Sequence, residues 1–278
     1  MRPGRTFTAA LLALLAPRTG LADGVPWPHT SDEPLAERFA PPPGARRLPL
    51  AAEHFGRFSR ALPVRPGRGV VLLHDGSEKR RQDVHAAVLD IDVGARDLQQ
   101  CADFALRLLA EHARAIGRSP CFRFTSGDPI PWARWAAGER PRVRGRRVIW
   151  ATGSPPSRAY PDFRRWLDAV FTYAGSASVH RDAVPVRGRP MPGDLFVQPG
   201  FPGHVVVVLD VAEDRAGRRF LLLAQSFMPA QSPHVLRGPA EDHPWYPAPA
   251  FDEALVTPEW RFPPRSARRL APRCRRSG

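Results

Sequence analysis

The chain has 278 residues, 43% of which are apolar, and a formal net charge of +14 at pH 7. That length and apolar content suffice for one sizeable hydrophobic core, which excludes an intrinsically disordered chain. The charge does not by itself indicate nucleic acid, because Lys79 is the single lysine and every other basic residue is Arg, as a coding bias would produce. No helix-turn-helix, zinc-finger or aromatic RNA-binding signature accompanies the arginines, so we expect no specific nucleic-acid partner. Attraction to an anionic envelope surface is equally compatible with the charge.

The N-terminus has the pattern of an export signal. Residues 1–5 are basic, residues 7–16 are apolar but too few to span a bilayer, and small residues precede Asp23. We therefore expect a signal peptide over residues 1–22, cleaved near Ala22. We then expect the mature protein to be periplasmic or secreted and to have no transmembrane segment.

Composition divides the rest of the chain into three parts. Residues 23–45 are rich in Pro and polar residues, which predicts a flexible leader. Residues 46–264 contain no internal repeat and no clean linker, so we expect a single α+β domain there. The Arg-rich residues 265–278 are expected to form a tail.

The first half of the domain is predicted to form a hairpin followed by a helix. Residues 70–73 and 84–92 are apolar runs around a polar connection, which favours two paired strands. The helix is expected to start with Asp97 as its N-cap and Gln100 completing a capping box. Apolar residues then keep helical spacing as far as Gly117, a typical helix stop.

The second half is predicted to consist mostly of strands. Residues 121–124 form a short strand, and a basic hairpin is centred on residues 144–146, with three tryptophans near it. A helix follows, and after it an all-strand segment. In chain order these elements are expected at residues 161–173 (helix), 193–197, 204–212 and 219–226 (strands).

Cys101 and His204 form the best candidate for a chemical site. Cys101 lies in the first turn of the predicted helix, where the helix dipole and unpaired N–H groups favour a thiolate. His204 begins an apolar strand and can serve as its general base. Three cysteines cannot all pair, so if Cys121 and Cys274 form a disulfide, Cys101 is the free thiol. Neither a Cys-x-x-Cys nor a His-Glu-x-x-His motif is present, and we expect no metal and no other cofactor.

Strand parity selects a partner for His204. If the turn after its strand centres between Asp214 and Arg215, Gln225 lies opposite His204 and can orient the imidazole. A slip of one residue presents Ser226 instead. The plainer alternatives are a small buried cysteine and a hydrogen-bonded core histidine, both of which are common.

Six short motifs carry a resemblance to a known family. The stretch from about residue 70 to residue 262 resembles an uncharacterised bacterial envelope family, domain of unknown function 4846, which implies no activity. The motifs are LQQCAD at 98–103, FTSG at 124–127, GDLF at 193–196, PGH at 202–204, LAQSFMPAQ at 223–231 and TPEW at 257–260.

The order of these motifs also resembles, more distantly, the papain-like superfamily of NlpC and CHAP cell-wall hydrolases. That resemblance implies an α+β fold in which a nucleophile helix packs on an antiparallel sheet. It further implies Cys101 as the nucleophile, His204 as the base and Gln225 as the orienting residue. Asp194 corresponds to a turn aspartate with a structural role.

The residues around Cys101 are expected to complete this site. The backbone N–H of Cys101, with the amide of Gln99 or Gln100, can stabilise an oxyanion or bind substrate. NlpC enzymes have an Asp-Cys-Ser motif, whereas here Gln100 precedes the cysteine and Ala102 follows it.

Two functions therefore compete. The first is a secreted thiol hydrolase, a peptidase or amidase acting on peptide or amide bonds such as those of cell-wall peptides. The second is a non-catalytic envelope module that uses an aromatic, Arg-rich rim to hold a glycan or an anionic polymer. A thiol within hydrogen-bond reach of the imidazole in an open groove supports the enzyme. A buried Cys101 with His204 turned away supports the binding module.

Overall fold

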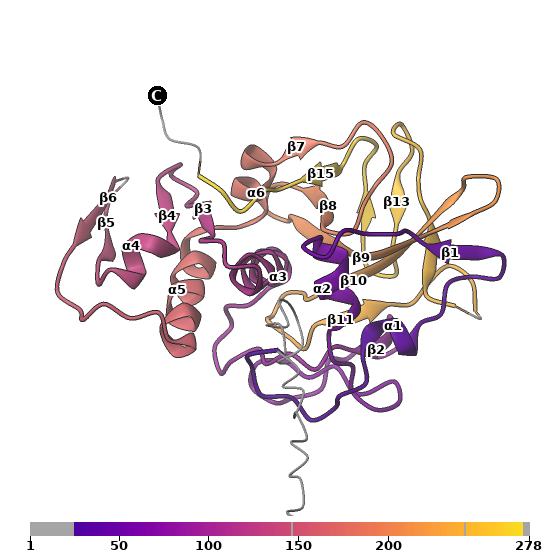
Figure 1. Ribbon diagram of the computed structural model, residues 1–278, viewed down its shortest axis with the longest axis horizontal. Coiled ribbons are helices and arrows are strands. Elements are labelled where there is room, and N and C mark those ends of the chain that lie inside the picture. Colours follow the sequence, from indigo (N-terminus) through magenta and orange to yellow (C-terminus); the bar gives the residue numbers. More distant parts are fainter. Residues whose placement is uncertain (1–24, 146, 242, 275–278) are drawn as a thin grey trace, which may run out of the picture.

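The computed structural model describes residues 25–145, 147–241 and 243–274. It is a mixed α+β fold built on one large, mostly antiparallel sheet (Figure 1). Its helices are α1 (Leu35–Arg38), α2 (Phe55–Arg60), α3 (Cys101–Ala115), α4 (Trp132–Ala136), α5 (Tyr160–Tyr173) and α6 (Ser176–Asp182). Its strands are β1 (Ala45–Arg47), β2 (His85–Val88), β3 (Cys121–Arg123), β4 (Pro129–Pro131), β5 (Arg140–Arg144), β6 (Arg147–Ala151), β7 (Val184–Pro185), β8 (Asp194–Gln198), β9 (His204–Asp214), β10 (Arg219–Gln225), β11 (His234–Leu236), β12 (Trp245–Pro247), β13 (Leu255–Val256), β14 (Arg261–Phe262) and β15 (Ala267–Arg269).

The large sheet has the strand order β2-β11-β10-β9-β8-β15-β7, with β1 paired to β9 and β12 paired to β10. Every pairing in it is antiparallel. The long strand β9 lies at its centre and is buried along nearly its whole length, which explains its run of consecutive valines. Three small two-stranded sheets, β3-β4, β5-β6 and β13-β14, complete the fold.

Helix α3 is enclosed between the sheet and α5. Figure 1 shows it nearly end-on, with β9 on one side and α5 on the other. Its N-cap is Gln100, whose backbone N–H donates to the carboxylate of Asp103 at 3.1 Å. The prediction that Asp97 is the N-cap is wrong. The Asp97 carboxylate instead accepts hydrogen bonds from the backbone N–H of Ala230 and the side chain of Gln100. Cys101 is therefore the first residue of the helix rather than a member of a turn already under way.

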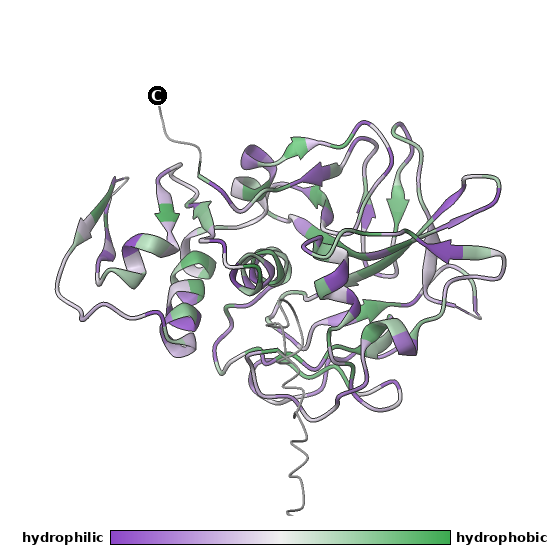
Figure 2. Cartoon of the chain, viewed as in Figure 1, coloured by the Kyte–Doolittle hydropathy of each residue, from purple (hydrophilic) through white to green (hydrophobic). Residues whose placement is uncertain are grey.

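The sheet buries apolar side chains on both faces. One face of β9, with Val205 and Val207, packs on α3 and belongs to the larger core. The opposite face, with Val206 and Val208, belongs to a second core with residues of β8, β10, β11 and β12–β14. Figure 2 shows the apolar residues concentrated along the central strands and α3. Residues with even numbers at the start of β9 thus point away from α3.

The β9–β10 hairpin has a different register from the expected one. Arg219 pairs with Glu213, so the turn centres on Ala216, and a β-bulge after Leu222 shifts the pairing by one residue. Ala224 then pairs with Val207. Gln225 is consequently diagonal to His204 on the same face, a position from which a long side chain still reaches.

The folded part of the chain is longer than expected at both ends. Residues 25–45 were predicted to form a flexible leader, but Trp27 and Leu35 are buried in the core. Residues 265–274 were predicted to belong to a tail, but β15 adds a strand beside β8, and Leu270 is also buried. The expected signal peptide lies outside the described residues. Among the described residues, no helix combines the length and apolar character needed to cross a bilayer.

Two further expectations are corrected. Residues 70–73 do not form a hairpin with the following strand, because β2 pairs with β11 instead. The segment after Gly175 begins with α6 rather than with strands. A hydrogen bond from the backbone N–H of Gly175 to the Ser178 hydroxyl starts this helix. The helix before Gly175, the basic β5-β6 hairpin and strands β8–β10 occur where they were expected.

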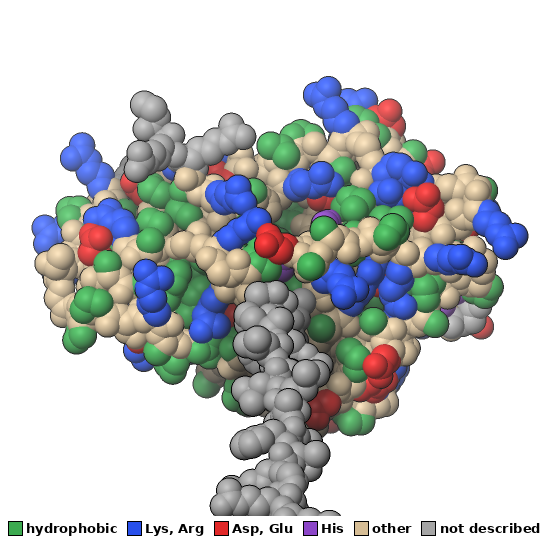
Figure 3. All heavy atoms as spheres, viewed as in Figure 1, with side chains coloured by type: hydrophobic (Ala, Val, Ile, Leu, Met, Phe, Trp, Pro, Cys, Tyr) green, Lys and Arg blue, Asp and Glu red, His purple; other side chains and the backbone are tan. Residues whose placement is uncertain are grey.

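The positive charge is dispersed. On the face shown in Figure 3, Lys and Arg side chains are scattered, with Asp and Glu between them. Many arginines pair with acidic residues, and Arg47 and Arg60 both contact the buried Asp210. This face therefore carries no continuous basic surface of the kind that binds a polyanion.

A disulfide joins Cys121 of β3 to Cys274 near the C-terminal end, closing a loop of 153 residues and leaving Cys101 as the free, buried cysteine. We predict that the oxidised protein, unfolded in denaturant, titrates one thiol with Ellman's reagent and three after reduction. The double variant Cys121→Ser/Cys274→Ser should lose about 4 kcal/mol of unfolding free energy, because its unfolded chain is no longer constrained. More than one thiol before reduction would contradict the pairing.

Candidate functional site

Cys101 occupies the first position of α3, and its environment suppresses its ionisation. Burial raises the pKa of the thiol to about 11, whereas the backbone N–H groups of Val205, Ala102 and Cys101 itself favour the thiolate. The nearby Asp103 carboxyl acts with burial to raise the pKa. The helix N-terminus alone therefore does not activate this cysteine in the structure as it stands.

A cavity of about 550 Å³ reaches Cys101 from the surface. The first turn of α3, the end of α5 and the loop formed by residues 200–203 line it, together with Met228. Gly203 is required in this wall, because a Cβ there would overlap the Gly200 carbonyl and the Ser176 hydroxyl. Phe201 at the tip of the loop is fully exposed. Cys101 thus lines a recess whose wall includes the loop of residues 200–203.

His204, the first residue of β9, is held by Gln225. Its Nε2 lies 2.7 Å from Oε1 of Gln225, and its Nδ1 is buried without a hydrogen-bond partner among the described residues. Burial lowers the pKa of the imidazole to about 4, although the bond to Gln225 acts in the opposite direction. The expected contact between His204 and Gln225 is present, but it is diagonal rather than directly across the hairpin.

Three aromatic rings enclose the imidazole. Phe227, Trp260 and Phe262 have ring centroids 4.8, 5.0 and 5.7 Å from that of His204. The indole N–H of Trp260 donates to the side chain of Gln198 at 3.1 Å, which fixes this ring beside the histidine. The enclosure leaves His204 with no exposed surface. It also explains much of the lowered pKa, because an apolar surrounding disfavours the charged form.

Lys79, Glu259 and His234 extend this polar cluster, and the sequence analysis did not identify any of them. The amide nitrogen of Gln225 donates to Glu259 Oε2 at 2.8 Å and lies 3.3 Å from Nε2 of His234. Glu259 in turn binds Lys79, with 2.7 Å between Nζ and Oε1. Two features of the sequence could have pointed to these residues. They are the single lysine in an arginine-rich chain and the TPEW motif, which contains Glu259.

The other predicted residues serve different contacts. Gln99 is fully buried, and its side chain binds Arg107 and the carbonyl of Asp92, so it does not line the cavity. The prediction that the side-chain amide of Gln99 stabilises an oxyanion is therefore wrong. Gln100 does line the cavity, with its amide donating to Asp97 at 2.9 Å. Ser226 donates to the carbonyls of Gln99 and Gln231 rather than contacting His204.

Asp194 ties two neighbouring strands together. Its buried carboxylate accepts hydrogen bonds from Nε and Nη2 of Arg269 at 2.6 and 2.8 Å and from the backbone N–H of Met191. These contacts join β8 to β15 and the turn before β8. They agree with the structural role expected for this residue.

Cys101 and His204 are neighbours in the structure, but no hydrogen bond joins the thiol to the imidazole. The sulfur faces the backbone N–H of Val205, the residue that follows His204. The imidazole points toward the second core, on the opposite face of β9 from α3. With pKa values of about 11 and about 4, thiol and imidazole are both neutral at pH 7, so no thiolate–imidazolium pair forms in this state.

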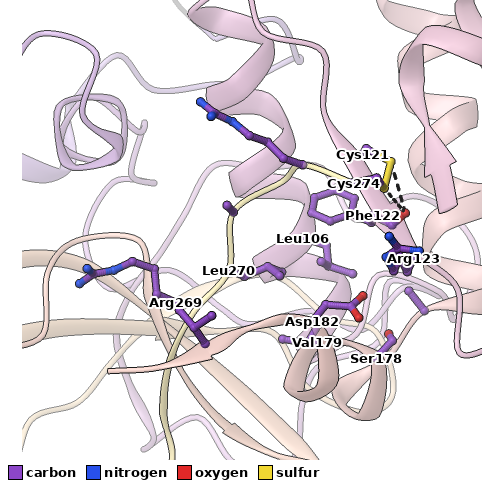
Figure 4. Close-up of a pocket in the computed structure, with 14 residues that line it drawn as sticks. Leu106, Cys121, Phe122, Arg123, Ser178, Val179, Asp182, Arg269, Leu270 and Cys274 are labelled. Atoms are coloured by element: carbon purple, nitrogen blue, oxygen red, sulfur yellow. Dashed lines mark hydrogen bonds between the residues drawn. A yellow bond between two sulfur atoms is a disulfide. The ribbon is translucent and has the colours of Figure 1, made fainter. Parts of the chain in front are cut away.

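A second cavity, of about 480 Å³, lies beside the disulfide and contains none of the predicted site residues. Figure 4 shows the disulfide between Cys121 and Cys274 at one side of it, with the apolar side chains of Leu106 and Leu270 nearby. Among the described residues, no group of three or more His, Cys, Asp or Glu side chains is placed to hold a metal ion. Of these two cavities, the one of about 550 Å³ is lined by the free cysteine, Cys101.

The raised pKa of Cys101 generates a prediction for its reactivity. Because the thiolate is the reacting form, alkylation by iodoacetamide should be slow near pH 8 and should accelerate up to about pH 11. The unfolded protein should instead react with the profile of an ordinary thiol. Intact-protein mass spectrometry against pH measures both, with Cys101→Ala as the control that takes up no label. Rapid labelling of the folded protein near pH 6 would contradict the raised pKa.

Burial of His204 and His234 predicts a loss of stability in acid. Their pKa values are lowered to about 4 and about 3, so the unfolded chain takes up protons at higher pH than the folded protein does. The free energy of unfolding should therefore fall as the pH drops from about 6.5 to 4, by roughly 3 kcal/mol per histidine. Urea denaturation at each pH tests this, and His204→Gln should flatten the dependence. An unfolding free energy independent of pH over this range would show the prediction to be wrong.

Comparison with known proteins assigns the chain to a family but not to an activity. The family described as Domain of unknown function (4846) matches residues 35–269, which is most of the chain and includes every residue of the site. No curated protein and no solved structure matches. The chain therefore belongs to this family of domains of unknown function.

Proposed function

We propose that the protein is an exported thiol hydrolase of papain-like type that cleaves peptide or amide bonds, with cell-wall peptides as its substrate class. Cys101 is the nucleophile, His204 is the base and Gln225 orients the imidazole. The observation that carries the proposal is the state of His204. One ring nitrogen is held at 2.7 Å by Gln225, and the other is buried with no partner among the described residues.

A histidine buried only for packing gains nothing from such an unpartnered nitrogen, since leaving a buried polar atom unpaired costs about 1–3 kcal/mol. A general base needs a free nitrogen for the incoming proton. The position of Cys101 supports the same role, because its sulfur faces the backbone N–H of Val205, next to His204, and the residue lines the 550 Å³ cavity. The disulfide between Cys121 and Cys274 supports export, since disulfides persist in oxidising compartments.

The reaction follows from these positions. As the thiol of Cys101 attacks the substrate carbonyl carbon, Nδ1 of His204 takes its proton, and a C–S bond and an oxyanion form. The backbone N–H of Cys101, which has no intrahelical partner in the first turn, stabilises the oxyanion. The C–N bond then breaks, and the leaving amine takes the proton from His204. Water, deprotonated by His204, hydrolyses the thioester and releases the acid and the thiol.

The resting site is closed, and catalysis requires the side chains to move. Because the imidazole points away from α3 and His204 does not line the cavity, the start of β9 must rearrange before thiol and imidazole come within hydrogen-bond reach. This is a larger change than the tightening that apo sites commonly show when substrate binds. The loop of residues 200–203 leads directly into His204 and lines the cavity, so substrate entering the cavity contacts this loop. Both groups are neutral at rest, so proton transfer accompanies the attack rather than preceding it.

One observation favours the alternative of a non-catalytic envelope-binding module. Cys101 is only 5% exposed and His204 is fully buried, and no hydrogen bond joins them. In that case the cluster around His204 only stabilises the fold. Such a module would bind cell-wall material without changing it, and Cys101→Ala would bind equally well.

The proposal is tested with peptides released from bacterial peptidoglycan, incubated with the protein and analysed by mass spectrometry. Wild type should release new amine and carboxylate ends, and Cys101→Ala should release none. His204→Gln should lower the rate roughly 10²- to 10⁴-fold, the usual contribution of a general base. His29→Gln, which changes an exposed histidine, is the matched control and should keep the wild-type rate. Binding without new ends, equal in wild type and Cys101→Ala, would establish the binding module and reject the hydrolase.

A further inference from the structure

The orientation of the Gln225 amide decides which nitrogen of His204 carries a proton. An amide oxygen can only accept a hydrogen bond, and an amide NH₂ can only donate. With its oxygen 2.7 Å from His204 Nε2, Gln225 requires the proton to be on Nε2, and Nδ1 is then the acceptor. A flipped amide would present NH₂ to Nε2 and move the ring proton to Nδ1. The base needed for the proposed reaction would be lost.

We propose that Lys79 and Glu259 are positioning residues that lock the Gln225 amide and thereby hold His204 in the tautomer that can accept a proton from Cys101. The inference rests on the proposed hydrolase function, because the tautomer matters for chemistry only if His204 is the base. Glu259 is the residue that fixes the orientation of the Gln225 amide. Its carboxylate, paired with the Lys79 ammonium, accepts hydrogen bonds, so the group 2.8 Å from it on Gln225 must be the NH₂.

Lys79 holds the Glu259 carboxylate in place by contacting both of its oxygens. Its ammonium lies 2.7 Å from one carboxylate oxygen and 2.9 Å from the other, and both side chains are at most about 10% exposed. Lys79 also sits over the ring of Phe227 at 4.9 Å from its centroid, and this ring in turn packs on His204.

His234 enforces the same amide orientation from the other side. Its Nδ1 lies 2.9 Å from the carbonyl of Ser232, which only accepts, so Nδ1 carries the proton. Burial keeps the ring neutral by lowering its pKa to about 3, and its Nε2 is therefore an acceptor. That atom faces the amide nitrogen of Gln225 at 3.3 Å. Two independent neighbours thus accept from the NH₂, and the oxygen is left for His204.

The backbone holds Glu259 in place. It lies in a tight turn between β13 and β14, in which the backbone N–H of Thr257 donates to the carbonyl of Trp260 at 2.8 Å. Trp260 from the same turn packs on His204 at 5.0 Å between centroids. Arg81, two residues after Lys79, donates to the carbonyl of Pro258 at 3.2 Å and joins the two loops. The lock is therefore part of a fixed local structure.

The experiment is ¹⁵N NMR of the histidine side chains at pH 7, which reports the protonated ring nitrogen directly. In wild type, His204 should carry its proton on Nε2 and His234 on Nδ1. In the double variant Lys79→Met/Glu259→Gln, which keeps the shapes and removes both charges, the acceptor left for the Gln225 NH₂ is His234 Nε2 at 3.3 Å, which holds it less firmly than Glu259 at 2.8 Å. His204 should then become a mixture of tautomers, and the rate of peptide cleavage should fall about a hundredfold or more. Glu259→Gln alone is the second variant, used if the double variant does not fold.

Asp210→Asn is the matched control. It removes another buried carboxylate of the sheet, whose partners are Arg47 and Arg60, and it should lower stability without changing the tautomer of His204. A proton on Nδ1 of His204 in wild type, or an unchanged tautomer in both Glu259 variants, would overturn the inference. Cleavage of cell-wall peptides together with an unchanged tautomer in the variants would leave the hydrolase standing and reject only the lock. Cleavage with the proton on Nδ1 of His204 in wild type would also reject Nδ1 of His204 as the base. The predicted tautomers without any cleavage would reject the hydrolase and keep the lock as a structural feature.

Discussion

Burial of helix α3 is the constraint on which the rest of the structure depends. Its polar residues cannot reach water and must find partners inside: Arg107 is fully buried and binds Asp92 and Gln99, while Glu111 accepts from the hydroxyl of Tyr160. Leaving one such charge unpaired typically costs 3–5 kcal/mol. These contacts fix the helix along its axis between the sheet and α5. They thereby fix its first residue, Cys101, beside the start of β9.

The sequence pattern predicted the elements whose cause is local. Apolar spacing and Gly117 gave the extent of α3, and strand parity gave the face shared by His204 and Gln225. The β-bulge after Leu222 was not predictable, because nothing in the composition of β10 distinguishes a regular pairing from a shifted one. The contact between Gln225 and His204 forms despite the shifted register, because a glutamine side chain is long enough to reach a diagonal neighbour.

Contacts between distant segments lay beyond sequence reasoning. Lys79 and Glu259 are 180 residues apart, and neither stands in a local pattern that indicates a partner. The burial of Trp27 and Leu35 was missed for a similar reason, since a Pro-rich segment predicts flexibility unless a core is available to receive its apolar residues. The ionisation of Cys101 was misjudged because only the helix N-terminus is visible in the sequence. Burial of the thiol outweighs the effect of the helix N-terminus, and this burial comes from the residues around the cavity and from β9.

The site combines rigid and adaptable parts. The imidazole is held by an amide, by three aromatic rings and by a buried ion pair behind them. The thiol faces a recess bordered by an exposed loop. In the proposed hydrolase, this division would keep the surroundings of His204 fixed and leave the change of shape to the loop beside the cavity. The same division leaves the fold stable around a histidine that is neutral at physiological pH.

The identity of Lys79 as the single lysine has a practical consequence. Its amine is buried against Glu259 and Phe227, so acylating reagents such as succinimidyl esters can modify a lysine side chain only when this region opens. The extent of acylation at a given time therefore reports the population of an opened state around His204. Arginine side chains do not react with these reagents, so the arginine-rich surface adds little background. Acylation of Lys79 can therefore serve as a probe of local opening.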